Sequence, residues 1–399
     1  MRVALIAAGL PLGGSTTFIL FLATGLKSIG IDVEVFSFTS ANPLAGDFSS
    51  AGIPVHVCNE AQDIYEDRLQ SLYDELRRFD PSVVASILGV ESYEILRYLP
   101  SGVLRVGVVL DMAIRPGVFI SSYSHVMDHV VVIANYLVKE VMRAKDHPPV
   151  THVQLGIPIP KNVAPRNPNP NAPLRLIYYG RLENDSKGVR MFPKIASALK
   201  KRNVQYEWTI QGTGPEESYL RHALAAEIQE GTIRFSAPVS NAVLPSIVRA
   251  HDIYILTSTN EGGPLTLLEA MALGIVPVCG DIPALVQDVI TADNGFRVPR
   301  ADADAYAERI SKLDADRNLL EQMSAAAQKA ITETFGQESM ARRYAQLFVS
   351  LAKPESSRAW PEEIRPIGLS GMASVLSSPL SRSLRRVAKR LRLFGNLKR

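Results

Sequence analysis

The most informative stretch of the chain is residues 257–280, TSTNEGGPLTLLEAMALGIVPVCG, in which a glycine-proline turn opens a helix between two glutamates. Pro264 fits the first helical position, where its missing N–H costs nothing. The amides of Leu265 and Thr266 then stay free at the positive end of the helix, where an anion can bind. The turn therefore predicts an anion site.

The two glutamates add a second chemistry to this site. Glu261 lies on the loop at the mouth of the turn. Glu269 follows Leu265 by four residues, so Leu265 and Glu269 lie on one face of the helix. Ionised carboxylates accept hydrogen bonds from hydroxyl groups. A site that binds an anion and a polyol together suits a phosphorylated sugar, and we prefer this interpretation to an ordinary amphipathic helix with solvated glutamates.

A pair of cations follows an expected strand at residues 174–179, within Gly180-Arg181-Leu182-Glu183 and Lys187-Gly188. Arginine offers a bidentate fork and lysine a point charge. Arg181 and Lys187 can therefore neutralise a diphosphate together and stabilise it as it leaves. The alternative is a solvated loop without a ligand.

Glycine turns follow two further expected strands. The sequence GLPLGG at residues 9–14 precedes the first helix, and glycines there let backbone amides approach a phosphate or sugar, with Gly13 and Gly14 as the candidates. It is not the dinucleotide fingerprint G-x-G-x-x-G. The turn at residues 212–215 ends the expected strand at 207–211, and part of its role is to start a helix.

Strand-like and helix-like runs alternate along the chain, which indicates an α/β protein with parallel, doubly wound sheets. Residues 159–173 are rich in proline and asparagine, the composition of a stiff linker. We therefore expect Rossmann-like domains at 1–158 and 174–335, a helix at 336–352 and a basic tail at 353–399. Ligands should bind between the domains, at the carboxyl ends of the strands.

The spacing of Glu261 and Glu269, with Gly262-Gly263-Pro264 between them and Glu-Ala-Met-Ala at the end, resembles the E-x7-E signature of family 4-type retaining glycosyltransferases, the glycosyl transferases group 1. The resemblance spans residues 1–350 and is most specific over 174–300. It implies the GT-B fold, in which two Rossmann-like domains face each other and a final helix crosses back onto the first.

The resemblance also implies how the site residues act. A UDP- or GDP-linked nucleotide sugar binds the second domain, and a glycan or lipid-linked acceptor binds the first. Arg181 and Lys187 grip the donor diphosphate, Glu269 holds the ribose, and Glu261 holds a donor-sugar hydroxyl. With Asp111, three of these residues form the expected catalytic set: Glu261, Arg181, Lys187 and Asp111. Donor contacts are expected from Gly13, Gly14, Gly180, Gly212, Val239, Gly262, Gly263, Pro264, Leu265, Thr266 and Glu269.

No metal ion is expected, because the two cations already supply the charge that a divalent ion would bring to a diphosphate. Asp302-Ala303-Asp304 imitates the metal-binding Asp-x-Asp of another glycosyltransferase fold. It precedes an expected helix at 305–313, where acidic residues cap the first turn. We therefore interpret it as a helix cap.

One position departs from the resembled family. Many members carry a histidine followed by an aspartate after the fourth strand of the first domain, facing the donor sugar, whereas this chain has Leu110 and Asp111 there. Asp111 is expected to contact the sugar or orient the acceptor. His125 and His129 follow shortly after, and we interpret both as structural residues.

The expected function is that of a hexosyltransferase-type enzyme in cell-surface polysaccharide or lipopolysaccharide synthesis. No carboxylate of the motifs is positioned as a covalent nucleophile, so the family-based expectation is substitution on the front face of the sugar. Two alternatives stay open. One is a nucleotide-sugar epimerase or a phosphorylase, and the other is a non-catalytic glycan-binding protein that keeps the GT-B fold.

Charge and cysteine content restrict the setting of the protein. The net charge is +3, but residues 381–399 carry eight basic residues and no acid, which leaves −5 on the rest and argues against a nucleic-acid partner. The two cysteines fit a reducing cytoplasm, and neither a signal peptide nor a membrane span is expected.

Apolar residues recur with a helical period in 379–399, so this tail is expected to dock peripherally on the anionic inner face of the cell membrane. The alternatives are a disordered tail or a helix packed on a partner subunit.

Overall fold

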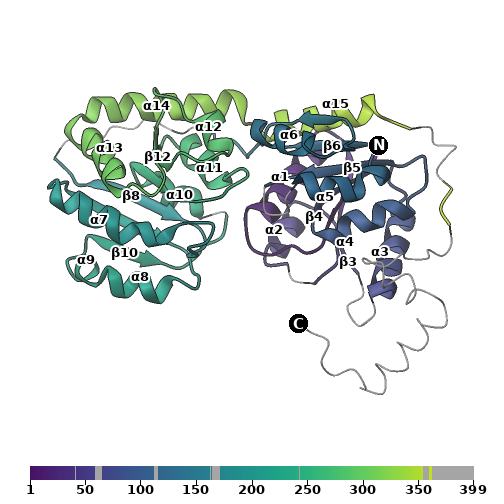
Figure 1. Ribbon diagram of the computed structural model, residues 1–399, viewed down its shortest axis with the longest axis horizontal. Coiled ribbons are helices and arrows are strands. Elements are labelled where there is room, and N and C mark those ends of the chain that lie inside the picture. The colour runs from purple at the N-terminus through teal and green to yellow at the C-terminus, as the bar shows by residue number, and fades with distance from the viewer. Residues whose placement is uncertain are drawn as a thin grey trace, which may run out of the picture.

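The chain folds into two α/β domains, each built on a parallel sheet (Figure 1). The computed structural model describes residues 1–40, 42–58, 65–111, 116–161, 163, 171–241, 243–353 and 359–361. Most of the expected linker at 159–173, most of the region 353–399 and all of the expected membrane-docking segment at 379–399 lie outside these ranges.

The first domain holds a sheet whose described strands lie in the order β3-β2-β1-β4-β5-β6-β7, all parallel. Valine, isoleucine and leucine fill the strands because helices cover both faces. The strands are β1 (Arg2–Ala7), β2 (Asp32–Ser37), β3 (Val55–Val57), β4 (Val83–Leu88), β5 (Leu104–Val109), β6 (His129–Val132) and β7 (Val150–His152). The helices are α1 (Gly14–Ser28), α2 (Ala45–Ser50), α3 (Tyr65–Phe79), α4 (Val90–Glu94), α5 (Pro116–Tyr123) and α6 (Asn135–Met142), with 3-10 turns η1 (Ile95–Tyr98) and η2 (Ser124–Val126).

The second domain repeats the plan with described strands in the order β10-β9-β8-β11-β12-β13, again all parallel. The strands are β8 (Leu174–Tyr179), β9 (Tyr206–Gln211), β10 (Ile233–Ser236), β11 (Ile253–Leu256), β12 (Val276–Gly280) and β13 (Phe296–Val298). The helices are η3 (Val189–Met191), α7 (Phe192–Lys201), α8 (Glu217–Ala223), α9 (Ala225–Gln229), α10 (Leu244–Arg249), α11 (Leu265–Ala272), α12 (Leu285–Val289), α13 (Ala303–Ala315) and α14 (Arg317–Thr334).

Each sheet reverses its strand order once, between β1 and β4 in the first domain and between β8 and β11 in the second. Loops that leave neighbouring strands at such a point diverge to opposite faces of the sheet, which opens a crevice at the carboxyl ends of the strands. The two loops with the expected cations and glutamates leave β8 and β11. The topology therefore brings the two sequence motifs together.

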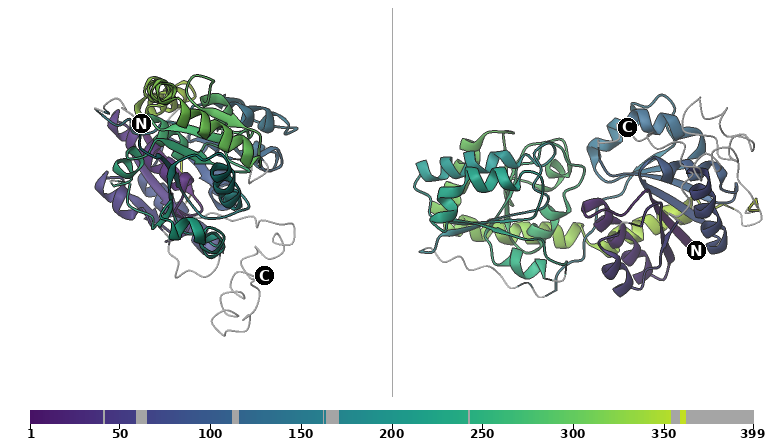
Figure 2. Two further views of the ribbon diagram at one scale, coloured as in Figure 1. Left: turned by 90° about the vertical axis from the view of Figure 1, so that its left-hand side faces the viewer. Right: turned by 90° about the horizontal axis from the view of Figure 1, so that it is seen from below.

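The last described helix, α15 (Gln337–Ser350), returns to the first domain, as expected (Figures 1 and 2). It lies against α1, where the Gln337 amide donates to the Phe21 carbonyl at 2.7 Å. The chain passes between the domains at Ile157 and again at Gly336, and these two residues pair as a short parallel bridge. The two crossings therefore lie side by side.

Candidate active site

The loops after β8 and β11 are joined by hydrogen bonds at the carboxyl edge of the second sheet. The Thr257 hydroxyl donates to the Lys187 carbonyl at 2.9 Å, and the Thr259 amide donates to the Ser186 carbonyl at 2.8 Å. Gly212 packs beneath them so closely that a Cβ there would lie 1.8 Å from the Gly180 carbonyl oxygen. These contacts explain why glycines occupy both positions, each of which also has a positive φ.

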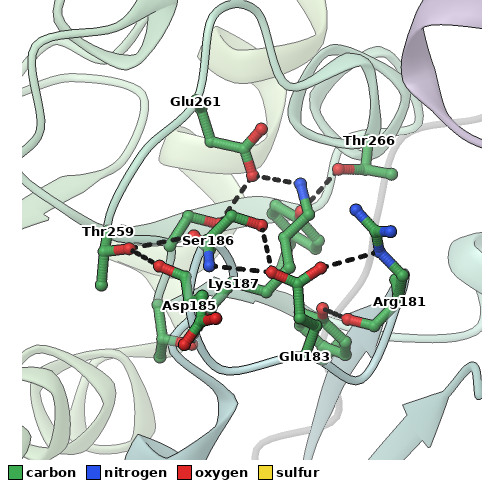
Figure 3. Close-up of polar contacts among 12 residues, drawn as sticks. Arg181, Glu183, Asp185, Ser186, Lys187, Thr259, Glu261 and Thr266 are labelled. Atoms are coloured by element: carbon green, nitrogen blue, oxygen red, sulfur yellow. Dashed lines mark hydrogen bonds and ion pairs between the residues drawn. The ribbon is translucent and has the colours of Figure 1, made fainter. Parts of the chain in front are cut away.

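The two cations lie on one of these loops, and both are held by glutamates (Figure 3). The Lys187 ammonium lies 2.5 Å from a carboxylate oxygen of Glu261, which also accepts the Ser258 hydroxyl at 2.7 Å. The Nε of Arg181 lies 3.0 Å from Glu183, while the Arg181 side chain remains 65% exposed. Arg181 therefore keeps its terminal nitrogens accessible to an incoming anion.

The motif helix α11 begins one residue later than the sequence predicted. Pro264 is the residue before the helix, with φ −67° and ψ 99°, so it stands in an extended conformation and not at the first helical position. The reason is that Pro264 still makes the last bend of the turn, since its carbonyl accepts the Leu267 amide at 3.0 Å. Leu265 and Thr266 become the first helical residues, and their amides have no acceptor within the helix.

Buried tyrosines fix the beginning of α11. The Tyr179 hydroxyl donates to the Thr266 carbonyl at 2.5 Å, and the Tyr254 hydroxyl shares a hydrogen bond of 2.7 Å with the Thr266 hydroxyl. Both tyrosines lie on the strands that flank the strand-order reversal, β8 and β11. The helix end therefore has a defined position relative to both loops.

Glu269 lies one helical turn further along α11, on the side that also carries Thr266. Burial raises the pKa of its carboxyl group to about 7 from an ordinary value of 4.5. Among the described residues it makes no hydrogen bond or ion pair, in contrast to Glu261. Its carboxylate is therefore a hydrogen-bond acceptor without a donor in the part of the chain that the structure describes.

The turn at the start of the motif also touches the first domain. A Cβ on Gly262 would lie 1.6 Å from the Leu110 carbonyl oxygen and 2.9 Å from the Asp111 Cα, and one on Gly263 would lie 2.2 Å from a methyl of Leu155. At position 262 the neighbouring atoms belong to the backbone of the first domain, so only glycine fits there. The structure thus brings Asp111 next to the turn that carries Glu261, as a site between the domains requires.

A family model described as "Glycosyl transferases group 1" matches residues 161–330, which include both loops and α11. The second domain is therefore similar to the glycosyl transferases group 1 family. The match is confined to this domain.

Curated relatives of the chain include the putative colanic acid biosynthesis glycosyltransferase WcaL of Salmonella typhimurium, 28% identical over 190 residues, which are 46% of each chain. The amylovoran biosynthesis glycosyltransferase AmsK of Erwinia amylovora is 27% identical over 45% of this chain and 46% of its own. The aligned region thus spans about half the length of the curated relatives.

Solved structures extend the likeness to both domains. Anabaena Alr3699/HepE, crystallised with UDP, superposes with a TM-score of 0.73 at 15% identity, covering 88% of this chain and all of its own. A Rickettsia africae glycosyltransferase gives a TM-score of 0.72 at 15% identity, covering 88% and 98%. These likenesses confirm the predicted GT-B fold.

Three further residues, Gly13, Gly14 and Val239, are expected to contact the donor. Gly13 and Gly14 stand at the exposed start of α1, with open space where a side chain would be. Val239 is 39% exposed in the loop after β10. No hydrogen bond among the described residues joins any of the three to residues 257–264. Their roles in ligand binding stay predictions.

The Asp302-Ala303-Asp304 segment and the two histidines of the first domain make structural contacts. Asp302 caps α13 by accepting the Ala305 amide at 3.0 Å, and Asp304 pairs with Arg202 at 2.9 Å. Buried His129 shares a hydrogen bond of 2.8 Å with the Thr151 hydroxyl, and burial lowers its pKa. His125 contacts Arg97.

Two absences can be stated for the residues that the structure describes. They contain no group of three or more histidine, cysteine or acidic residues that could hold a metal ion. Nor do they form any helix that is both long and apolar enough to span a bilayer.

Sequence reasoning assigned no role to Glu183 or Tyr136. Besides Arg181, Glu183 binds the Ser186 amide and hydroxyl, each at 3.1 Å, so it shapes the loop that leads to Lys187. The Tyr136 hydroxyl donates to the Glu261 carbonyl at 3.0 Å from the first domain. Glu183 lies within the motif at residues 180–183, whereas Tyr136 belongs to none of the motifs in the sequence.

Proposed function

We propose that the chain is a retaining glycosyltransferase of the hexosyltransferase type, which transfers a sugar from a nucleotide-sugar donor to a glycan or lipid-linked acceptor. The observation that carries this proposal is the convergence of three features at the β8/β11 reversal. The first feature is the pair of cations, Arg181 and Lys187, and the second is the amino end of α11 with its free amides. The third is a pair of carboxylates, of which Glu261 is ion-paired with Lys187 and Glu269 is buried with a raised pKa. Together they suit a diphosphate bound to two polyols.

Each part of the donor has a matching group. The accessible guanidinium of Arg181, the ammonium of Lys187 and the amides of Leu265 and Thr266 would bind the diphosphate. Glu269, whose carboxylate has no donor among the described residues, would accept the ribose hydroxyls. Glu261 would accept a hydroxyl of the sugar, between the diphosphate and Asp111.

These groups support a front-face substitution. The bond between the anomeric carbon and the leaving phosphate oxygen breaks, and the acceptor hydroxyl oxygen bonds to the same face of that carbon. The acceptor proton passes to the leaving phosphate, so the products are the glycoside and the nucleoside diphosphate. Arg181 and Lys187 stabilise the negative charge that develops on the leaving group, which is where preorganised donors contribute most.

We propose that this reaction proceeds without a metal ion, since Arg181 and Lys187 would themselves supply the positive charge that a divalent ion brings to a diphosphate. Chelation with EDTA should leave turnover unchanged. Activity lost to EDTA and restored by magnesium or manganese would refute metal independence while leaving the transfer reaction in place.

The names of the relatives support the substrate classes. WcaL and AmsK are named for colanic acid and amylovoran biosynthesis, and a Xanthomonas oryzae relative is a GDP-mannose:cellobiosyl-diphosphopolyprenol alpha-mannosyltransferase, 26% identical over 35% of this chain. HepE has been crystallised with UDP-glucose. We therefore propose a UDP- or GDP-linked donor and a role in cell-surface polysaccharide or lipopolysaccharide synthesis.

We also propose that the enzyme works at the inner face of the cell membrane, held there by residues 379–399. Leu380, Leu384, Val387, Leu391 and Phe394 recur at helical spacing, and arginines and lysines occupy much of the rest of this segment. Each basic residue near an anionic surface contributes about 1 kcal/mol. A lipid-linked acceptor would be presented at the same surface.

A screen of nucleotide sugars tests the proposed function. Thermal shift identifies the donor, because a bound ligand raises the melting temperature, and release of nucleoside diphosphate is then measured with and without glycan acceptors. Release of nucleoside diphosphate that requires an acceptor, or that is faster with one, supports the transferase. Epimerised or phosphorolysed donor without an acceptor would indicate the first alternative, and binding without turnover would indicate a non-catalytic glycan-binding protein.

A further inference from the structure

The amino end of α6 in the first domain contacts the second domain through two consecutive residues. The Tyr136 hydroxyl donates to the Glu261 carbonyl at 3.0 Å. The backbone amide and side-chain amide of Asn135 donate to the two carboxylate oxygens of Asp288, each at 3.3 Å. Asp288 lies on α12, whose first amide in turn donates to the Gly262 carbonyl.

Tyr136 is suited to act as a permanent donor in this contact. Its ring is partly buried against the hydrophobic core, which fixes its direction. Burial raises the pKa of its phenol, and the carboxylates of Asp111 and Glu261 raise it further. The hydroxyl therefore stays protonated over the whole range in which enzymes are assayed.

The Glu261 residue is consequently held from both domains. Its carboxylate is bound by Lys187 and Ser258, which belong to the second domain. Its carbonyl is bound by Tyr136, which belongs to the first. The following residue, Gly262, has no room to move toward the first domain, because its Cα already abuts the Leu110 carbonyl.

We propose that Tyr136 is a positioning residue that couples the approach of the first domain to the placement of Glu261. When the domains separate, the hydrogen bond from Tyr136 to the Glu261 carbonyl breaks. The turn then loses this contact with the first domain. When they close, Tyr136 sets the turn in the geometry for transfer. The expected effect of Tyr136 on turnover rests on the proposed transferase function. The expected effect of Tyr136 on the position of the turn does not rest on it.

The contact between Asn135 and Asp288 provides a matched control. It joins the same two domains through the neighbouring residue of α6, but it does not touch Glu261. Asp288→Asn should weaken the interface and leave the Glu261 carbonyl bonded. If Tyr136 contributed only to the interface, both variants would have the same effect.

The test compares Tyr136→Phe, which keeps the ring and removes the donor, with Asp288→Asn and the parent full-length protein. We expect Tyr136→Phe to lower kcat about fivefold to tenfold, the scale of one net hydrogen bond, while KM for the donor and Kd for the nucleoside diphosphate stay within twofold. Asp288→Asn should keep kcat within twofold. A kcat unchanged in Tyr136→Phe, or lowered equally in both variants, would overturn the inference.

A second measurement is independent of turnover. Hydrogen exchange of the peptide covering residues 257–263 should be at least threefold faster in Tyr136→Phe than in Asp288→Asn, at unchanged melting temperature. Equal exchange would overturn the inference. If the parent neither transfers nor hydrolyses any nucleotide sugar, the proposed function fails, and the exchange rates alone decide whether Tyr136 positions the turn.

Discussion

The ammonium of Lys187 lies 2.5 Å from a carboxylate oxygen of Glu261, and this ion pair joins the loops that follow β8 and β11. Sequence reasoning gave the two residues different ligand groups, the diphosphate and the sugar. The structure adds that each is the other's partner. In the proposed function, a bound diphosphate would compete for Lys187 and leave Glu261 free to accept a sugar hydroxyl, so donor binding and sugar recognition would be linked through one contact.

Replacing Arg181 with alanine should reduce kcat/KM by an amount equivalent to about 2 to 4 kcal/mol, the scale for removing one preorganised donor from a leaving group. Glu183 binds the Nε of Arg181 and so orients its guanidinium, whose terminal nitrogens remain accessible. Arg190→Ala is the matched control, because Arg190 pairs with Glu216 on the exposed surface nearby. Steady-state kinetics should show the control near the parent, and a kcat/KM for Arg181→Ala within threefold of the parent would contradict the assignment.

Replacing Gly262 with alanine should separate the domains at the site. The added Cβ would lie 1.6 Å from the Leu110 carbonyl oxygen and 2.9 Å from the Asp111 Cα, and these are backbone atoms that cannot rotate away. Nucleoside diphosphate binding should persist, because Arg181, Lys187 and Glu269 all belong to the second domain, while transfer should fall more than a hundredfold. The control is Gly46→Ala, where a Cβ meets open space. Full transfer by Gly262→Ala would show that the contact between the domains is dispensable.

The raised pKa of Glu269 predicts how stability depends on pH. The folded protein binds this proton more tightly than the unfolded chain does, since burial raises the pKa to about 7 from 4.5. The stabilisation is therefore complete below pH 4.5 and is lost as the pH rises through 7. Relative to Glu269→Gln, the ligand-free parent should lose up to about 3 kcal/mol of unfolding free energy over this range, at about 1.4 kcal/mol per pKa unit.

Urea unfolding of both proteins at pH 5 and pH 8 measures this difference, and the other titrating groups cancel in the comparison. A difference between parent and variant that does not change with pH would show that Glu269 ionises normally in the folded protein.

The basic tail makes a prediction that is separate from the site. Deleting residues 379–399 should abolish sedimentation with anionic liposomes at low salt, because the segment carries the excess positive charge, and should leave transfer to a soluble acceptor unchanged. Neutral liposomes serve as the control surface. Equal sedimentation of the full-length and truncated proteins would assign membrane binding to another part of the chain or to none.

The local structure of the candidate site could be predicted from the sequence where turn, helix and charge signals coincide in one segment. The run from Glu261 to Glu269 combines turn residues, helix formers and acids within nine positions, and its neighbours in the fold follow from strand order alone. Asp302 could be read as a helix cap because caps depend only on the next three residues. The crossing of α15 followed from resemblance, since no local pattern indicates which domain a helix packs on.

Other features could not be predicted because they depend on distant contacts. The hydrogen bond between Tyr136 and Glu261 joins residues 125 positions apart, and an isolated tyrosine at the start of a helix carries no signal for such a partner. The three-residue strands β3, β7 and β13 are too short for a periodicity to appear. The helix expected after the turn at residues 212–215 is divided at Leu224, a buried residue with φ −113°, and no proline or glycine marks this break in the sequence.

The measurement that tests the central claim most directly is calorimetric titration of nucleoside diphosphates into the parent, Glu269→Ala and Glu261→Ala. In the proposed function the nucleotide binds the second domain, with Glu269 on the ribose and Glu261 on the transferred sugar. Glu269→Ala should therefore weaken nucleoside diphosphate binding at least tenfold, whereas Glu261→Ala should keep the parental affinity and lose turnover. Parental affinity and normal transfer in both variants would contradict the assignment of the site.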